Sequence, residues 1–250
     1  MRRTTRISSF AAAALIAAAG LTVAVPAEAQ SRRAAPAAER SDWPARAAPA
    51  QTRAVTFAAT ASPSGALVLP LASEAELTAR GATLDAGTRQ AIASALTAAR
   101  FDYKARQTLN LHGVGGWDRI LVVGLGDTPK AADIQTAGIV AGRALNSQPG
   151  ALTALTSGLS ADLASELATG LGIGHYRSDI YVTTGRDRPA PGALTVVADD
   201  ASGAQAHHRR GAALIEAMAW TRDVSNEPAN IIYPESFVER ARVAFAGVPG

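Results

Sequence analysis

Apolar and polar positions between residues 54 and 202 follow two alternating periods. Nearly continuous apolar runs, typical of buried strands, occupy residues 54–59, 65–72, 120–125, 151–157 and 192–200. Between them, apolar residues recur at helical spacing, as Ile92, Leu96 and Ala99 do behind Asp85, a suitable N-cap. This alternation predicts an α/β fold, a sheet with helices on its faces.

Capping residues predict the other helices. Thr128 can cap a helix that has Pro129 at its first position and runs to about residue 145. Ser160 can cap a second helix that reaches about residue 171, and a long third helix is expected over residues 203–224.

A joint follows this last helix at residues 225–237, SNEPANIIYPESF. Pro228 and Pro234 disfavour helical dihedrals at the residues before them, so the preceding helix should end near Val224. A new helix can begin with Pro234 at its first position and Glu235 at its second, where a carboxylate is favoured by the helix dipole. Taken alone, this pattern requires no more than a helix–loop–helix.

The N-terminus has the pattern of a secretory signal peptide over residues 1–29: a basic start, an apolar run, and Ala-Glu-Ala before Gln30. An uncleaved anchor is the alternative, but the run is short for a bilayer and rich in alanine. Residues 30–53 alternate Ala, Pro and Arg without an apolar period, so they are predicted to be a disordered linker. The expected location is therefore periplasmic or extracellular, with no stable membrane anchor after cleavage.

Charge and cysteine content exclude several function classes. The formal net charge is +3, but the basic excess lies within residues 1–53, which leaves a slightly acidic body. A clustered phosphate-binding face, and hence a nucleic-acid partner, is therefore not expected. The chain has no cysteine, which excludes disulfides, thiolate nucleophiles and cysteine metal sites.

The four histidines, His112, His175, His207 and His208, do not form a metal motif. His207 and His208 are adjacent and would point about 100° apart on a helix, and no HExxH segment is present. They are interpreted as surface or packing residues.

Nucleophile and cation motifs are equally weak. Ser64 and Ser157 each precede a glycine beside a predicted strand, but neither lies in the GxSxG context of a nucleophile elbow. Asp199 and Asp200 at a strand end could bind a cation, although such a pair is more often a solvated turn.

One glycine pair lies between a predicted strand and a predicted helix. Gly124-Leu125-Gly126 is similar to the start of a dinucleotide-binding turn, but Pro129 stands where the third glycine would be. The interpretation favoured here is a tight strand-to-helix turn.

Residues 217–242, AMAWTRDVSNEPANIIYPESFVERAR, resemble the segment that links the two domains of leucine aminopeptidases, hexameric dinuclear-metal exopeptidases. Asn-Glu-Pro-Ala-Asn at 226–230 is the most characteristic part. Residues 119–126, RILVVGLG, and 174–179, GHYRSD, are similar to the family's central strand and turn and to its Gly-x-Tyr-x-x-Asp segment.

The resemblance implies a domain plan. Residues 54–202 would form an N-terminal α/β domain with a macrodomain-like mixed sheet flanked by helices. Residues 203–232 would form a linker helix and hinge, and 233–250 the beginning of a truncated peptidase catalytic domain. The complete enzyme would be a leucyl aminopeptidase, a hydrolase that removes N-terminal amino acids from peptides. The family implies two divalent ions, zinc or manganese, a homohexamer, and usually a cytoplasmic location.

Two departures from the family qualify this expectation. Tyr233 replaces the threonine that would cap the new helix, a loss of about 1 kcal/mol. The Asn-Thr-Asp-Ala-Glu-Gly-Arg, Gly-Lys-Gly and Asp-Thr-Gly-Gly segments of the family's metal site are absent, and Lys104 and Lys130 lie in the wrong domain to supply its lysines. The chain itself is therefore predicted to be inactive, and no residue is assigned a catalytic, cofactor-binding or metal-binding role.

Two alternatives remain. The domain could be a free-standing macrodomain-like binding module for a nucleotide-derived ligand such as ADP-ribose, although the acidic body and the incomplete phosphate turn argue against it. It could also be a non-catalytic element for oligomer assembly, because this domain type lies at the periphery of the family's hexamers.

Overall fold

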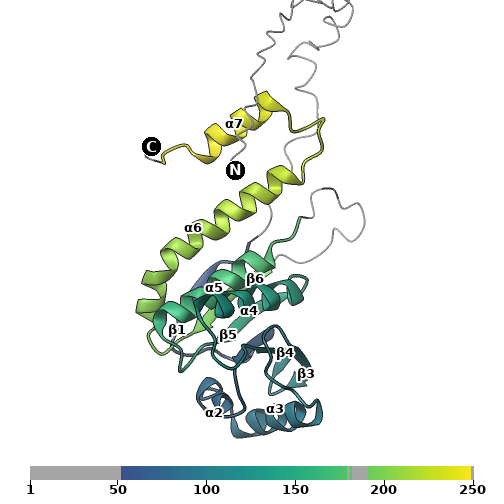
Figure 1. Cartoon of the computed structure of the whole chain (residues 1–250), viewed down its shortest axis with the longest axis vertical. Helices are drawn as coiled ribbons and strands as arrows, with labels where there is room; N and C mark the ends of the chain where they lie inside the picture. Colours follow the sequence, from purple (N-terminus) through teal and green to yellow (C-terminus); the bar gives the residue numbers. More distant parts are fainter. Residues whose placement is uncertain (1–51, 179–180, 182–190, 249–250) are drawn as a thin grey trace, which may run out of the picture. The chain divides into compact units, whose positions relative to one another are not determined.

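The computed structural model describes residues 52–178, 181 and 191–248 (Figure 1). The chain divides into two compact units, Met1–Arg46 and Ala47–Gly250, and every described residue belongs to the second. The predicted signal peptide and nearly all of the predicted linker lie outside the described residues. Among the helices of these ranges, none combines the length and apolar character needed to cross a bilayer.

A six-stranded mixed sheet forms the centre of the second unit, in the order β1-β6-β5-β2-β4-β3. Neighbouring strands are parallel except β3 and β4, which are antiparallel. The strands are β1 (Val55–Ala58), β2 (Ala66–Leu71), β3 (Thr108–Val114), β4 (Trp117–Gly124), β5 (Gly150–Leu155) and β6 (Pro191–Val197). The five strands predicted from apolar runs are confirmed.

The edge strand β3 was missed because its pattern differs from that of the buried strands. Exposed Thr108, Asn110 and His112 alternate with partly buried residues, so only one face of β3 packs against the core. By contrast, all six residues of β2 are buried, as expected for a parallel strand covered on both faces.

Six helices complete the described fold: α2 (Glu76–Arg80), α3 (Ala86–Ala98), α4 (Ala131–Ala144), α5 (Ala161–His175), α6 (Ala201–Ser225) and α7 (Pro234–Ala244). Asp85 caps α3 as predicted, because its side chain accepts a hydrogen bond from the Thr88 amide. The predicted start of α4 was wrong by two residues. Its N-cap is Lys130, whose amide donates to the Asp133 carboxylate at 2.9 Å.

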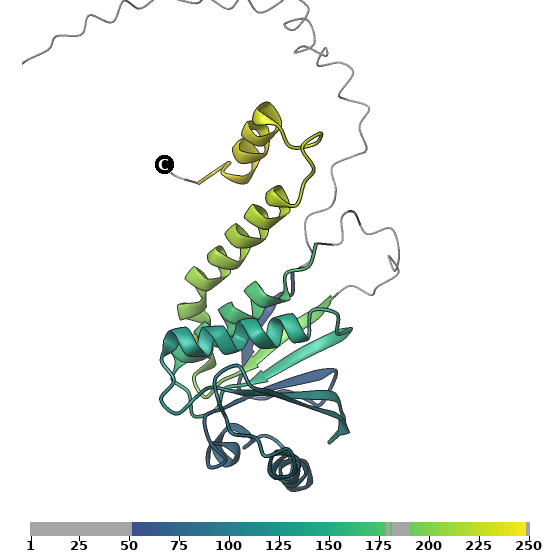
Figure 2. The ribbon, with the colours of Figure 1, turned by 45° about the vertical axis from the view of Figure 1, so that its right-hand side comes forward.

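The helices cover both faces of the sheet, with α4 and α5 on one side and α2 and α3 on the other (Figure 2). Alternate residues of the central strands supply the two cores. Val68 and Leu121 pack with Ile134 and Leu167, while Leu69 packs on the opposite face with Ile92. This is the period-two division of side chains in a strand.

Helices α4 and α5 approach each other at backbone distance through paired glycines. A Cβ on Gly138 would lie 2.4 Å from the Leu167 carbonyl oxygen, and one on Gly142 would lie 2.5 Å from the Leu171 oxygen. From the other side, a Cβ on Gly170 would lie 2.0 Å from the Gln135 oxygen. Only glycine permits such close contact.

Helix α5 also packs closely against α6. A Cβ on Gly172 would lie 2.4 Å from the Ile215 Cδ1 atom, and one on Gly211 would lie 2.0 Å from the Thr169 hydroxyl oxygen. Helix α5 is therefore packed between two neighbouring helices, and its glycines set both distances.

Arg53 anchors the chain at the entrance to β1. The sequence pattern places this residue in the linker, but its side chain is buried. It donates to the Gly192 oxygen at 2.9 Å, to the Gln148 oxygen at 2.6 Å, and to the Gly150 oxygen. Its Nε donates to Nε2 of His175 at 2.8 Å. The folded part thus begins earlier than predicted.

His175 must be neutral to accept this hydrogen bond. The ring is only 5% exposed, and within the described residues its Nδ1 has no partner. Burial, followed by the positive charges of Arg53 and Arg177, lowers the pKa of His175 to about 4. Protonation would remove the acceptor and place two positive charges in contact.

We expect Gly170→Ala to destabilise the protein by about 2–3 kcal/mol, because a methyl group between α4 and α5 forces the helices apart. This loss outweighs the roughly 1 kcal/mol that alanine gains in helix propensity. Urea unfolding measures the difference. Gly87→Ala is the control, since Gly87 lies in the exposed first turn of α3 and a Cβ there would lie 3.2 Å from Asp85 Oδ1. Equal effects of the two substitutions would contradict the role of the glycine contact.

Stability should also fall with acidification. The pKa of His175 is about 4 in the folded state and about 6.5 in the unfolded state, so between these values the unfolded chain binds more protons. The free energy of unfolding should be fully retained above about pH 6.5 and should decrease by about 3 kcal/mol as the pH falls to 4.

Urea unfolding of the wild type and of His175→Gln over this pH range tests the prediction. Glutamine can accept the Arg53 hydrogen bond and does not titrate, so the variant should depend less steeply on pH. An unchanged slope would show that His175 is not the group responsible.

Candidate functional site

The carboxyl ends of the parallel strands are where α/β proteins usually bind ligands. In this chain the ends of β2, β4, β5 and β6 lie on this edge of the sheet. The residues at this edge are therefore the first candidate site.

The glycine turn after β4 has its amides already in use. The Gly124 amide donates to the Gln107 oxygen at 2.8 Å, Leu125 to Leu71 at 2.9 Å, and Gly126 to Tyr103 at 2.9 Å. These are the groups that would hold a phosphate in a dinucleotide turn. The interpretation as a tight strand-to-helix turn is therefore confirmed.

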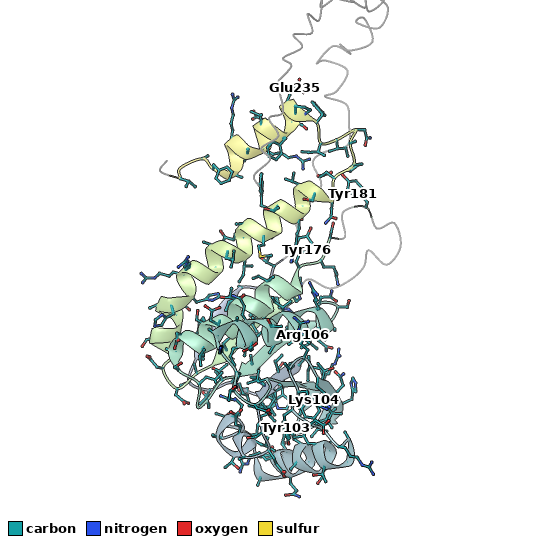
Figure 3. All side chains as sticks on the ribbon, viewed as in Figure 1. Tyr103, Lys104, Arg106, Tyr176, Tyr181 and Glu235 are labelled. Carbon is teal, nitrogen blue, oxygen red and sulfur yellow. The ribbon has the colours of Figure 1, made fainter. Side chains whose placement is uncertain are left out.

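The loop between α3 and β3 explains why Gly124 is a glycine. A Cβ on Gly124 would lie 2.2 Å from the Lys104 oxygen and 2.8 Å from the Tyr103 oxygen. The glycine thus allows the loop to lie directly on the end of β4. Figure 3 shows Tyr103, Lys104 and Arg106 in this region.

Three residues of this loop have left-handed backbone conformations: Arg100 (φ 49°), Tyr103 (φ 58°) and Arg106 (φ 68°). The first belongs to a Schellman motif that ends α3, in which the Phe101 amide donates to the Leu96 oxygen at 3.0 Å. Farther along, the Gln107 side-chain oxygen accepts from the amides of residues 102 and 104. The strain is thus offset by hydrogen bonds within the loop.

Lys104, which the sequence analysis excluded from a catalytic role, lies exposed in this loop. It forms an ion pair with Asp102 at 2.8 Å, and the hydrogen bond to this carboxylate raises the pKa of Lys104. The contact is local.

Arg80 fills the space between the ends of β2 and β5. Its buried guanidinium donates to the Pro70 oxygen at 3.1 Å and to the Ser157 oxygen at 2.6 Å, and it pairs with Glu76 at 3.1 Å. The Glu76 carboxylate also accepts from the Ala72 amide at 2.9 Å. A ligand entering here would have to displace the chain's own buried arginine. Together with the occupied glycine turn, this argues against the macrodomain-like binding module.

Ser64 and Ser157, the two serines weighed as nucleophiles, lie in different environments. Ser157 is buried and contributes its carbonyl oxygen to Arg80, while Ser64 is exposed before β2. Neither observation suggests a nucleophile.

The histidines lie in separate environments, as the sequence analysis expected. His112 and His207 are exposed on β3 and α6. His208 packs edge-on against Phe57, with ring centroids 5.3 Å apart, and burial lowers the pKa of His208. Within the part of the chain that the structure describes, no three His, Cys, Asp or Glu side chains converge on a common point.

Asp199 and Asp200 serve the backbone. Asp199 accepts from the Gly158 amide at 2.7 Å, and Asp200 caps α6 by accepting from the Gly203 amide at 2.9 Å. The Gly203 amide, followed by the Ser202 hydroxyl, lowers the pKa of Asp200. The two carboxylates therefore form a turn and a helix cap, in agreement with the second of the two interpretations.

The hinge is the other candidate region, and it is held by polar contacts from both sides. Helix α6 ends at Ser225 and α7 begins at Pro234, close to the predicted positions. Between them Glu227 is buried. It forms an ion pair with Arg240 of α7 at 2.8 Å and accepts a hydrogen bond from the Tyr181 hydroxyl.

Tyr176 secures the last turn of α6 from the sheet side. Its hydroxyl donates to Asp223 at 2.9 Å and accepts from the Asn226 amide group at 3.0 Å. Burial and the hydrogen bond to Asp223 raise the pKa of Tyr176. Arg222 stacks over the tyrosine ring, 5.2 Å from its centroid, and donates to the Ile173 oxygen at 2.8 Å.

The predicted weak cap at Tyr233 is partly compensated. The Tyr233 amide donates to the Ser236 hydroxyl at 2.9 Å, and this hydroxyl donates in turn to the Ile231 oxygen. Ser236 thus satisfies a helix-terminal group from the third helical position, a role that the sequence analysis missed.

Comparison with known proteins agrees with these features. Residues 68–184 match the model of the cytosol aminopeptidase family, N-terminal domain. A probable cytosol aminopeptidase of Xanthobacter autotrophicus is 30% identical over 199 residues, which cover 76% of this chain and 40% of the relative. One of Methylorubrum populi is 34% identical over 162 residues, covering 60% of this chain and 31% of the relative.

Two solved structures share the fold. A mutant of tomato leucine aminopeptidase has a TM-score of 0.62 at 21% identity and covers 80% of this chain and 44% of its own. The bottromycin maturation enzyme BotP has a TM-score of 0.52 at 23% identity, with coverages of 73% and 37%. The chain thus spans less than half the length of these relatives. It belongs to the cytosol (leucyl) aminopeptidase family, represented by the family's N-terminal domain.

Proposed function

We propose that this chain supplies the N-terminal domain and hinge of a metal-dependent aminopeptidase that removes N-terminal amino acids from peptides. The match of residues 68–184 to the family's N-terminal domain carries the proposal. The names of the curated relatives support it, and BotP has been solved in complex with Mn.

The described residues do not fit a pair of metal ions, because no group of three potential ligands converges among them. The lysine and carboxylate segments that the family resemblance requires are also absent from the sequence. We therefore assign no catalytic step to this chain. Its proposed contribution is structural: a rigid sheet that holds the hinge and, with it, the catalytic half of the enzyme. Assembly into a homohexamer is part of the same proposal.

A chimera tests this function. In the Xanthobacter autotrophicus relative, the segment that aligns with this chain is replaced by this chain's own residues. We expect the chimera to hydrolyse leucine p-nitroanilide when supplied with manganese or zinc. The 250-residue chain alone should show no hydrolysis under the same conditions.

The unmodified relative is the control for assay and metal loading. A chimera that folds but stays inactive would contradict the proposed role of the domain. Metal-dependent hydrolysis by the isolated chain would contradict its assignment as non-catalytic. A strictly monomeric chimera in sedimentation would count against the hexamer.

We further propose that the protein is exported and cleaved after Ala29, as the tripartite pattern of residues 1–29 indicates. N-terminal sequencing of the protein from the periplasm or medium of an expressing bacterium should begin at Gln30. The control is the double substitution Ala27→Arg and Ala29→Arg, which should block cleavage because the site requires small residues at these positions. A cytoplasmic product that still begins at Met1 would reject export.

A further inference from the structure

We propose that Glu227 is a positioning residue: its buried ion pair with Arg240 fixes the direction of α7 relative to α6. The functional consequence rests on the proposed function, since α7 begins the part of the chain that would lead into the catalytic half. The effect on α7 itself can be measured on this chain alone.

The contact joins three segments that are separate in the sequence. Glu227 lies in the hinge, Arg240 lies in α7, and Tyr181 lies beyond the end of α5. The Glu227 side chain is 3% exposed and the Arg240 side chain 14% exposed, with 2.8 Å between Oε1 and Nη1. The Tyr181 hydroxyl donates to the other oxygen, Oε2. Both oxygens of the carboxylate therefore have charge-assisted partners, which come from different segments of the chain.

The contact with Glu227 also affects the pKa of the Tyr181 phenol. Desolvation, followed by the hydrogen bond and negative charge of Glu227, raises the pKa of Tyr181 to about 12. The Tyr181 hydroxyl therefore stays protonated and remains a donor to the carboxylate at neutral pH. Figure 3 shows Tyr181 beside the end of α6, where the hinge begins.

Apolar contacts between α6 and the α7 segment are partly open to solvent. The ring centroid of Trp220 in α6 lies 6.1 Å from that of Phe237 and 5.8 Å from that of Phe245. These two phenylalanines are 45% and 60% exposed, and no residue of α7 is fully buried. Because apolar contact is non-directional, these rings can hold α7 close to α6 in more than one orientation. The ion pair selects one of them.

The hinge backbone limits the remaining freedom. Glu227 precedes Pro228, which restricts its backbone to extended conformations and thereby the direction of its side chain. The amides of Ile231 and Ile232 both donate to the Pro228 oxygen, at 2.9 Å and 3.0 Å. Glu227 thus directly precedes a short, hydrogen-bonded turn, which restrains the position of its carboxylate.

Spin-label distances in the full chain test the proposal. The chain has no cysteine, so labels can be attached at Ala213→Cys in α6 and Glu239→Cys in α7, both exposed positions, without removing any native residue that reacts. Double electron–electron resonance should give one narrow distance distribution. In Glu227→Gln its width should roughly double, because only non-directional contacts then hold α7.

Glu235→Gln is the matched control, since it makes the same change at an exposed carboxylate of α7 and should leave the distribution unchanged (Figure 3). Arg240→Met provides a second test of the same pair and should broaden the distribution as Glu227→Gln does. Circular dichroism checks that the sheet melts at the wild-type temperature in each variant. A wild-type distribution in folded Glu227→Gln and Arg240→Met, or equal broadening in the control, would overturn the proposal.

The same substitutions in the chimera connect the contact to activity. Glu227→Gln should lower kcat several-fold with little change in KM, while Glu235→Gln should change neither. An inactive parent chimera would count against the proposed function and leave the distance result standing. An active chimera that is insensitive to Glu227→Gln would overturn the link between hinge geometry and activity.

Discussion

Backbone-to-backbone packing of α5 is the constraint on which the described structure depends. Gly170 and Gly174 allow this helix to contact the backbone of α4, and Gly172 allows it to contact Ile215 of α6. Side chains at these positions would separate the three helices. The separation would move α6 relative to the sheet, and with it the hinge at its end. These glycines therefore set the distances between helices although they bury little apolar surface.

The end of α5 transmits this geometry in two directions. His175 accepts a hydrogen bond from Arg53 and so links the residues before β1 to the end of α5. Tyr176 forms hydrogen bonds with Asp223 and Asn226 at the end of α6. Tyr181, a few residues later, reaches Glu227 in the hinge. One short segment thus holds the start of the sheet, the linker helix and the hinge. This gives a physical meaning to the family-like segment at 174–179, whose last residue lies outside the described ranges.

The fold was largely predictable from the sequence because its central strands are continuous apolar runs and its helices are periodic. The exceptions have local causes. Edge strand β3 carries polar residues at alternate positions. Helix α4 has Lys130 rather than Thr128 as its N-cap, because Asp133 accepts a hydrogen bond from the Lys130 amide.

The roles of the buried arginines could not be predicted. Arg53 and Arg80 bind mostly carbonyl oxygens, and the Gly192 partner of Arg53 is 139 residues away. Every residue offers a carbonyl, so no sequence pattern identifies such partners. The same holds for Glu227, whose charge suggests a solvated surface residue until the fold brings Arg240 and Tyr181 to it.

At the carboxyl edge of the sheet and in the hinge, buried polar groups bind other groups of the same chain. Buried Arg80 between the ends of β2 and β5 and the occupied amides of the glycine turn leave the usual ligand position of the fold to the chain's own groups. Meanwhile, a buried carboxylate is placed in the hinge, where the cost of its desolvation is offset only while both partners stay in position. An unpaired carboxylate at this depth would be strongly disfavoured, so the hinge resists the intermediate orientations of α7 that would separate Glu227 from Arg240. The polar groups that could have bound a ligand are used instead to hold the domain rigid and to define how the chain leaves it.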